Sequence, residues 1–184
     1  MLKTRSINTD TALDGELKGL YMTAFPVEEQ IPYDDIISLM RVLDIDYMAY
    51  YDDDDSLVGM TMVLRMPRYN RGWYFAVPEQ LRGRGYGQDI LSALLGKYRN
   101  HRPFIIDIES PWQADAPNLE QRQRRHAFYV RNGLKDTPTS RTFDGITYTI
   151  MTNSDEPFSQ LDYDDILASL RSVWERMPRE QESV

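Results

Sequence analysis

The sequence predicts one mixed α/β domain, and three observations support this fold class. Short aromatic or β-branched runs between turn residues indicate strands, and longer segments with apolar residues three or four positions apart indicate helices. The two kinds of segment alternate along the chain. At 184 residues the chain can bury a sizeable core in one domain and is too short for two comfortable ones.

The first half of the chain predicts one strand, two helices and three more strands. Pro26 and Pro32 bound the link between the two helices, and the acidic run at 52–55 reads as a hairpin turn. The predicted elements are a strand at 3–7, a helix with Leu13, Leu17, Leu20, Tyr21 and Ala24 on one face, a helix at 33–42, and strands at 46–51, 57–65 and 72–77.

The second half predicts two helices and three strands before a last helix. Gly133 is a good helix stop, and Asp144-Gly145 joins the last two strands. The predicted elements are a helix with Gly87, Ile90, Leu91, Leu94 and Tyr98 on its buried face, a strand at 104–109, a helix ending near 132, and strands at 134–141 and 146–152.

A C-terminal amphipathic helix is predicted beyond the last strand, with Asp162 as its cap. Its apolar stripe consists of Tyr163, Ile166, Leu167, Leu170, Val173, Trp174 and Met177. We expect a main domain at 1–153, a helical extension at 154–178 that packs on this domain or at a homodimer interface, and a flexible tail at 179–184.

Composition excludes several classes of function. The net charge of −8 disfavours nucleic acid as a partner and suits a cationic amine. The absence of cysteine and the presence of only two histidines argue against thiolate nucleophiles and a metal site. There is no secretory signal or long apolar run, so we expect a cytoplasmic protein with no membrane partner.

The segment Arg82-Gly83-Arg84-Gly85-Tyr86-Gly87 lies between a predicted strand and a predicted helix. Glycines leave backbone N–H groups uncovered, and a helix N-terminus carries partial positive charge, so this junction is suited to bind an anion. A Walker loop would need Lys and Ser or Thr at the place of Gln88-Asp89. A dinucleotide fingerprint would need a third glycine at position 88.

A second motif occupies residues 124–134. On a helix, Tyr129 shares a face with Arg122, Arg125 and His126, whereas Phe128 points about a hundred degrees away. One aromatic side chain can therefore anchor the core while the other faces a cleft.

Together the two motifs resemble those of the GNAT acyltransferase superfamily. Its pyrophosphate loop has the pattern Gln/Arg-x-x-Gly-x-Gly/Ala, which Arg82, Gly85 and Gly87 match, and its later helix carries a Phe/Leu-Tyr pair followed by Gly, which Phe128-Tyr129 and Gly133 match. The resemblance covers about residues 2–152. It implies a GNAT-like mixed, mostly antiparallel central sheet flanked by helices.

The resemblance also implies N-acetyl transfer from acetyl-CoA to a primary amine by direct attack, without a metal. Tyr129 takes the family role of general acid toward the CoA thiolate, for which a phenol with a pKa of about 10 is suitable. A backbone N–H near Val77 polarises the thioester carbonyl. The implied cofactor-binding residues are Phe75, Ala76, Val77, Arg82, Gly83, Arg84, Gly85, Tyr86 and Gly87.

Two positions depart from the family pattern. Arg71 stands where some members have a glutamate base, and Arg122 stands where many have an asparagine that contacts the pantetheine. Asn118 is our candidate for that amide.

A base must therefore be sought elsewhere. Asp107 and Glu109 alternate with isoleucines and share one strand face, where proximity would raise one pKa. Glu109 is our first choice as base and Asp107 the second. The alternative is that one or both pair with arginines, while Glu28, Glu29 or Asp35 binds a cationic substrate.

Two functions remain open. The first is an N-acetyltransferase. The alternative is a noncatalytic acyl-CoA-binding regulatory module, which the missing carboxylate at position 71 favours and Tyr129 opposes. The acceptor is expected to lie against residues 25–43 and 136–145, where no short motif encodes its identity.

Overall fold

The computed structural model describes residues 2–11, 15–99 and 102–176. The predicted tail at 179–184, and Leu13 and Met177 of the predicted helix faces, lie outside the described residues. No helix in these ranges has the length and apolar character of a membrane span.

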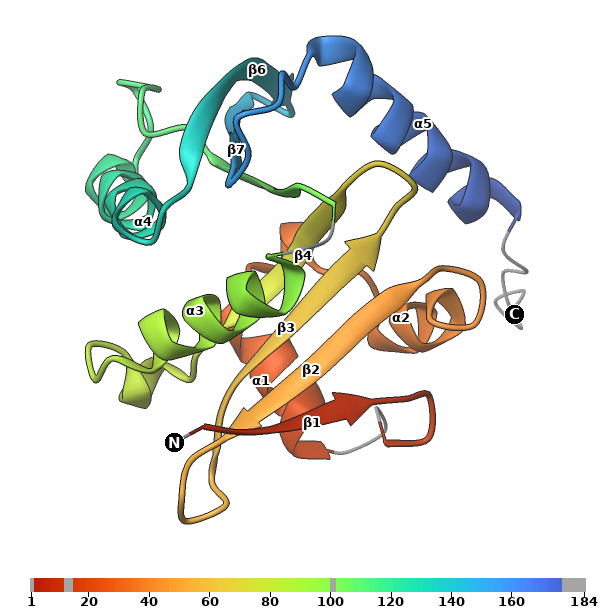
Figure 1. Cartoon of the computed structure of the whole chain (residues 1–184), viewed down its shortest axis with the longest axis vertical. Coiled ribbons are helices and arrows are strands. Elements are labelled where there is room, and N and C mark those ends of the chain that lie inside the picture. The colour runs from red at the N-terminus through yellow and green to blue at the C-terminus, as the bar shows by residue number, and fades with distance from the viewer. Residues whose placement is uncertain (1, 12–14, 100–101, 177–184) are drawn as a thin grey trace.

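In the described residues, seven strands form one sheet in the order β1-β2-β3-β4-β5-β7-β6, and five α-helices cover it (Figure 1). The strands are β1 (Lys3–Ile7), β2 (Ile45–Tyr51), β3 (Leu57–Arg65), β4 (Asn70–Ala76), β5 (Phe104–Glu109), β6 (Lys135–Phe143) and β7 (Ile146–Thr152). The helices are α1 (Gly15–Ala24), α2 (Tyr33–Leu39), α3 (Tyr86–Tyr98), α4 (Leu119–Arg131) and α5 (Gln160–Arg176), with 3-10 turns η2 (Val27–Glu29) and η3 (Glu79–Leu81). All strand pairs are antiparallel except β4 with β5, which confirms the predicted mixed, mostly antiparallel fold.

The parallel pairing of β4 with β5 is short, and this opens the sheet. Only Asn70–Gly72 pairs with Phe104–Ile106, although β4 continues to Ala76 and β5 to Glu109. Beyond these pairs β4 is bonded only to β3, and β5 only to β7. We call the opening between residues 73–76 and 107–109 the fork.

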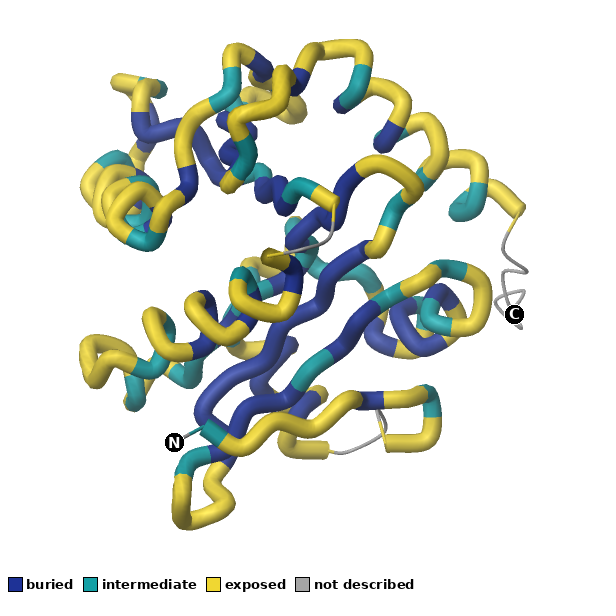
Figure 2. The backbone as a smooth tube through the Cα atoms, viewed as in Figure 1, coloured by how far each residue is buried: buried dark blue, intermediate teal, exposed yellow. Residues whose placement is uncertain are grey.

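Helices cover both faces of the sheet. On one face, α3 and α4 pack through Leu91, Leu94 and Tyr129 on Ile106 and Ile108. On the other face, α1 and α2 cover β2 to β4, while α5 covers β5 and β7. Figure 2 shows the central strands as buried and the outer surfaces of the helices as exposed, so the apolar core lies in two layers on either side of the sheet.

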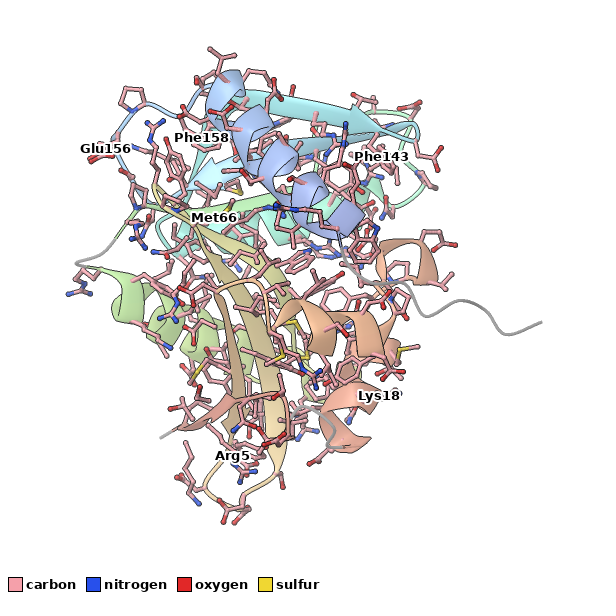
Figure 3. The ribbon with its side chains drawn as sticks, turned by 90° about the vertical axis from the view of Figure 1, so that its right-hand side faces the viewer. Arg5, Lys18, Met66, Phe143, Glu156 and Phe158 are labelled. Carbon is pink, nitrogen blue, oxygen red and sulfur yellow. The ribbon has the colours of Figure 1, made fainter. Side chains whose placement is uncertain are left out.

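The C-terminal helix begins three residues earlier than predicted. Ser159 precedes α5, and its hydroxyl accepts the Asp162 N–H at 3.3 Å while the Asp162 carboxylate accepts the Ser159 N–H at 2.9 Å. This reciprocal pair is a capping box, so Ser159 is the cap in place of the predicted Asp162. Tyr163 and Ile166 then pack with Ile105 of β5 and Ile150 of β7. Figure 3 shows α5 lying across the strands on the face turned to the viewer.

Gly59 of β3 offers a test of the packing beside the fork. A Cβ at this position would lie 2.8 Å from the Ala76 carbonyl oxygen and 2.4 Å from Cδ1 of Ile90. The Ile90 side chain can move away from the added Cβ, but the Ala76 carbonyl is part of the backbone of β4 and cannot. We therefore expect Gly59→Ala to lower the free energy of unfolding, measured by urea titration, by about 1–3 kcal/mol.

The matched control is Gly96→Ala in α3, where nothing lies within 4 Å of the added Cβ. Alanine favours the helix by up to about 1 kcal/mol, so this variant should be at least as stable as the parent. Equal stability of the two variants would contradict the close approach of β3 to β4.

Candidate functional site

A cleft of about 1600 Å³ occupies the fork. Both open strand edges line it, together with segments from both faces of the sheet. We call one part the loop half, lined by Val77, Arg82, Gly87, Phe128 and Tyr129, and the other the hairpin half, lined by Glu29, Arg141, Phe143, Tyr148 and Trp174.

The glycine-rich loop has the conformation of an anion cradle. Gly83 and Gly85 have φ values of +76° and +93°, a region that residues with a Cβ adopt at a cost. Gly85 is the N-cap of α3, and its carbonyl accepts the N–H groups of Gln88 at 2.9 Å and Asp89 at 3.1 Å. The N–H groups of Tyr86 and Gly87 precede these first helical bonds and remain available to a ligand.

Only some of the predicted cofactor-binding residues line the cleft. Arg84, Gly85 and Tyr86 shape the same loop without lining the cleft. The residues that do line it are Phe75, Ala76, Val77, Arg82, Gly83, Gly87 and Asn118.

A β-bulge at the fork sets which way the β4 side chains point. The register of β3 against β4 shifts between Met62 and Val63, which pair with Tyr74 and Gly72, so Trp73 is the extra residue. A bulge reverses the alternation of side chains along its strand. Phe75 therefore packs in the core beneath α3 and α4, while Tyr74 packs against α1 on the other face.

Both aromatic residues of the α4 motif line the cleft. The expectation that one would serve the core and the other the cleft is therefore too simple. Tyr129 is 5% exposed and also belongs to the core, and Phe128 lies 6.2 Å from Phe75, ring centroid to ring centroid. The helix ends at Arg131, and Gly133 follows its C-cap Asn132 with a φ of +88°.

The Tyr129 hydroxyl is suited to donate a proton. Burial raises its pKa to about 12, and the nearby charge of Arg125 opposes this rise. The phenol is therefore protonated across the neutral range, and Tyr129 lines the loop half of the cleft.

Asp107 pairs with an arginine, which is the alternative that the sequence analysis left open, and the pKa rise expected for one of the two carboxylates does not occur at Asp107. Arg71 Nε donates to Oδ1 at 3.0 Å and Nη2 to Oδ2 at 2.7 Å, and the Tyr163 hydroxyl of α5 donates to Oδ2 at 3.2 Å. Burial alone would raise the pKa of Asp107, but the charge and hydrogen bonds of Arg71 outweigh it and lower the pKa below 3.8. A carboxylate held in this way is a poor base.

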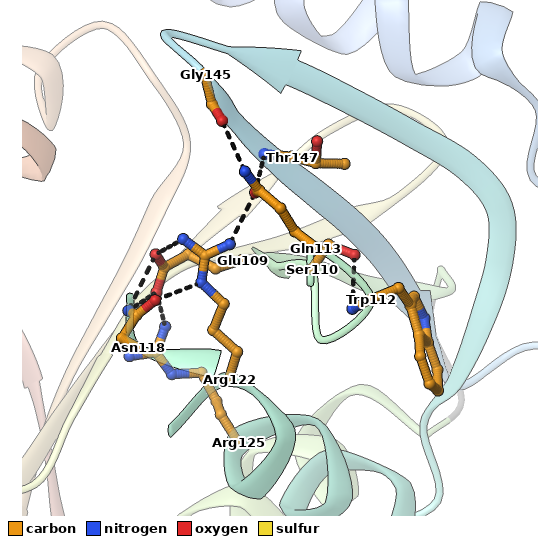
Figure 4. A network of polar contacts seen from close by, with 9 residues as sticks. All are labelled: Glu109, Ser110, Trp112, Gln113, Asn118, Arg122, Arg125, Gly145 and Thr147. Carbon is orange, nitrogen blue, oxygen red and sulfur yellow. Dashed lines mark hydrogen bonds and ion pairs between the residues drawn. The ribbon is translucent and has the colours of Figure 1, made fainter. Parts of the chain in front are cut away.

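Glu109 also lies in an ion-pair network, shown in Figure 4. Arg122 approaches one carboxylate oxygen at 2.8 Å and Arg125 the other at 3.3 Å, while the Asn118 amide donates to both at 3.3 Å. Asn118 also accepts the Arg122 Nε–H at 2.7 Å. Both ends of the Asn118 amide are therefore engaged within the protein.

Gln113 anchors this network to the β6–β7 hairpin. Its side-chain oxygen accepts from Arg122 Nη1 at 2.9 Å and from the Thr147 N–H at 3.0 Å, and its amide donates to the Gly145 carbonyl at 2.9 Å (Figure 4). The arginine that replaces the family asparagine thus holds Glu109 and, through Gln113, the hairpin.

Glu29 combines partial burial with a free carboxylate. It is half-buried on η2 and lines the cleft, and no described residue forms an ion pair with it. Burial raises its pKa above 4.5, the charge of Glu109 adds to the rise, and Arg125 opposes it. Glu28 also lines the cleft but is exposed, whereas Asp35 does not line it.

Sequence reasoning missed Tyr148 and Trp174 as cleft residues, whereas Arg141 lies in the segment 136–145 that it expected to contact the acceptor. The alternation of the last strand could have placed Tyr148 on the face of Ile146 and Ile150, but nothing in the sequence says that this face meets the fork. Within the described ranges, no group of three acidic or histidine residues is placed to hold a metal ion.

Comparisons with known proteins agree with this geometry. A sequence model described as the acetyltransferase (GNAT) family matches residues 15–133. A search of the curated proteins finds no significant match.

Several solved structures share the fold. A protein from Bacteroides thetaiotaomicron described as a GNAT-family acetyltransferase is 20% identical, with a TM-score of 0.74, over 96% of this chain and 99% of that one. A Bacillus subtilis acetyltransferase in complex with CoA is 15% identical, with a TM-score of 0.59, over 83% and 97%. The ribosomal-protein-S18-alanine N-acetyltransferase of Escherichia coli is 14% identical, with a TM-score of 0.62, over 86% and 100%.

The Arg71–Asp107 pair predicts a pH dependence of stability. Asp107→Asn leaves a buried guanidinium without its counter-charge, so we expect the free energy of unfolding at pH 7 to fall by about 3–5 kcal/mol. Because the pKa of Asp107 is depressed in the folded state, its contribution exists above the unfolded pKa and is lost as the pH falls through the folded pKa.

Urea titrations between pH 7 and pH 2 measure both effects. The stability difference between parent and Asp107→Asn should shrink below about pH 4. Asp155→Asn, which removes an exposed partner of Lys135, should change little. A difference that stays constant with pH would show that the ion pair does not carry this stability.

Proposed function

The chain belongs to the acetyltransferase (GNAT) family. We propose that it moves an acetyl group from acetyl-CoA to a primary amine by direct attack. The observation that carries the proposal is the meeting of the Arg82–Gly87 loop, the open edge of β4 and Tyr129 in one cleft. The Bacillus subtilis acetyltransferase is described in complex with CoA, and the Escherichia coli protein is named a ribosomal-protein-S18-alanine N-acetyltransferase. These two descriptions support the proposal of a CoA donor and an amine acceptor.

The donor is held in the loop half. The pyrophosphate binds the N–H groups at the start of α3 together with Arg82, and the pantetheine follows the edge of β4 that the fork leaves unpaired. Phe75, Ala76 and Val77 supply backbone donors and acceptors along this edge. Val77 remains our choice for the N–H that polarises the thioester carbonyl.

Tyr129 donates a proton to the departing thiolate. Its raised pKa keeps the proton in place until the sulfur develops charge. The arginine on the preceding turn, Arg125, is paired with Glu109 and does not replace it as the donor.

Glu29 takes the proton from the incoming ammonium, directly or through water. Glu109 was our first choice from the sequence, but three donors already engage its oxygens, and protonation would disrupt these contacts. Glu29 has a carboxylate without such a partner and a pKa raised toward the useful range. In this arrangement the negative charge of Glu109 raises the pKa of Glu29.

Release of free CoA in the presence of an amine panel tests the reaction. We expect Tyr129→Phe to lower kcat by roughly 10²-fold or more while acetyl-CoA binding, measured by calorimetry, stays within about two-fold. Tyr50→Phe, which removes another buried hydroxyl outside the cleft, is the control. Binding of acetyl-CoA without transfer to any amine would support a noncatalytic acyl-CoA-binding module instead.

The pH profile of kcat/KM separates the two candidate bases. The parent should show an acid limb with an apparent pKa above 4.5, because activity requires the Glu29 carboxylate. Glu29→Gln should remove this limb and lower kcat/KM by about 10²-fold or more. Glu109→Gln should shift the limb to lower pH, because it removes a negative charge that raises the Glu29 pKa.

Asp34→Asn is the control for this profile, since it changes an exposed carboxylate of α2 that does not line the cleft. Full activity in Glu29→Gln, together with loss of activity in Glu109→Gln, would assign the base to Glu109.

A further inference from the structure

The hairpin half of the cleft contains a row of side chains that spans three strands. Arg141 of β6 stands directly opposite Tyr148 of β7, and Tyr148 stands directly opposite Glu109 of β5. Directly opposed residues of an antiparallel pair point to the same side, and neighbouring strands lie about 4.8 Å apart. All three side chains line the cleft.

Glu29 faces this row from the link between α1 and α2. Burial raises the pKa of Tyr148, and among the charges that add to this rise that of Glu29 is the largest, ahead of Glu109 and Asp107. Glu29, Tyr148 and Arg141 thus line the same cleft.

The arginines of the cleft differ in their partners. Arg71 and Arg125 pair with carboxylates of β5, and the exposed Arg124 pairs with Glu120. Arg82 and Arg171 also line the cleft without an ion pair to a described residue, but both are exposed. Arg141 is half-buried and lies over the Phe143 ring at 5.2 Å, and no carboxylate among the described residues lies within ion-pair distance of it. A half-buried guanidinium that faces a cleft without a counter-charge is suited to bind an anionic group of a ligand.

The wall beyond this arginine is largely apolar. Phe143 and Ile146 of the hairpin and Leu170 and Trp174 of α5 line the same part of the cleft. An acceptor can therefore place an apolar group against α5 while its charged groups contact the row.

We propose that the acceptor is an amino acid or a very short peptide whose amine binds at Glu29 and whose free carboxylate binds Arg141. This inference rests on the proposed acetyl transfer and names its substrate class. A polyamine fits less well, because its second cation would meet Arg141 instead of a carboxylate.

Matched pairs of acceptors test the proposal. We would measure kcat/KM for the common L-amino acids, for their carboxamides and for spermidine. Each amide keeps the amine and the side chain but lacks the charge, and its amine is less basic, so intrinsic reactivity at neutral pH favours the amide. We expect the best amino acid to exceed its own amide at least ten-fold.

Arg141→Gln should lower kcat/KM for that amino acid at least ten-fold, leave its amide within about three-fold, and thereby remove the preference. Arg141→Lys should restore part of the preference for the amino acid over its amide. Arg131→Gln, an exposed arginine of α4 that does not line the cleft, should behave as the parent. A parent that prefers amides or spermidine, or an Arg141→Gln variant that loses both acceptors equally, would overturn the proposal.

Binding measurements separate this proposal from the proposed reaction. If no acceptor is acetylated, calorimetry of the CoA-loaded protein with the amino acids and their amides still tests the proposed ligand class. Amino-acid binding that is lost in Arg141→Gln would support the ligand class although the transfer reaction had failed. Absence of any Arg141-dependent binding would overturn the ligand class.

Discussion

The early end of the β4–β5 pairing is the constraint on which the rest of the structure depends. Three residues on each strand hold the two halves of the sheet together, and the strands then separate with their backbone groups facing inward. Unpaired N–H and C=O groups of a strand edge need partners. In this protein the edge lies inside a cleft, where an extended ligand can pair with it. The glycine-rich loop, Tyr129 and the residues proposed to bind the acceptor all line this opening.

Electrostatics then divides the cleft. The β5 carboxylates are neutralised by Arg71 on one side and by Arg122 and Arg125 on the other, so the floor of the fork carries compensated charge. Glu29 and Arg141, by contrast, line the cleft without an ion-pair partner among the described residues. The other unpaired charged residues that line the cleft are exposed, whereas Glu29 and Arg141 are half-buried. The cleft is therefore a more selective environment than the net charge suggests.

The sequence predicted the elements well because each is specified locally. The apolar spacing of α3, the glycines of the loop and the Asp144-Gly145 turn are all contained in short windows. The roles of Asp107 and Glu109 could not be predicted in the same way, because their partners lie in other elements: Arg71 is 36 residues away from Asp107 and Tyr163 is 56 away. Tyr148 and Trp174 were missed for the same reason, since only the fold brings the hairpin and α5 to the fork.

The position of α5 has a consequence for how this protein can diverge. In the proposed reaction the donor contacts residues 75–87 and Tyr129, whereas the opposite wall of the cleft comes from residues 141–148 and from a helix that follows the last strand. Substitutions at separate sites have nearly additive effects. Selection can therefore reshape the wall at Leu170 or Trp174 without degrading the machinery that activates the thioester. Descendants of one ancestral chain could acquire new acceptors while inheriting the same donor chemistry.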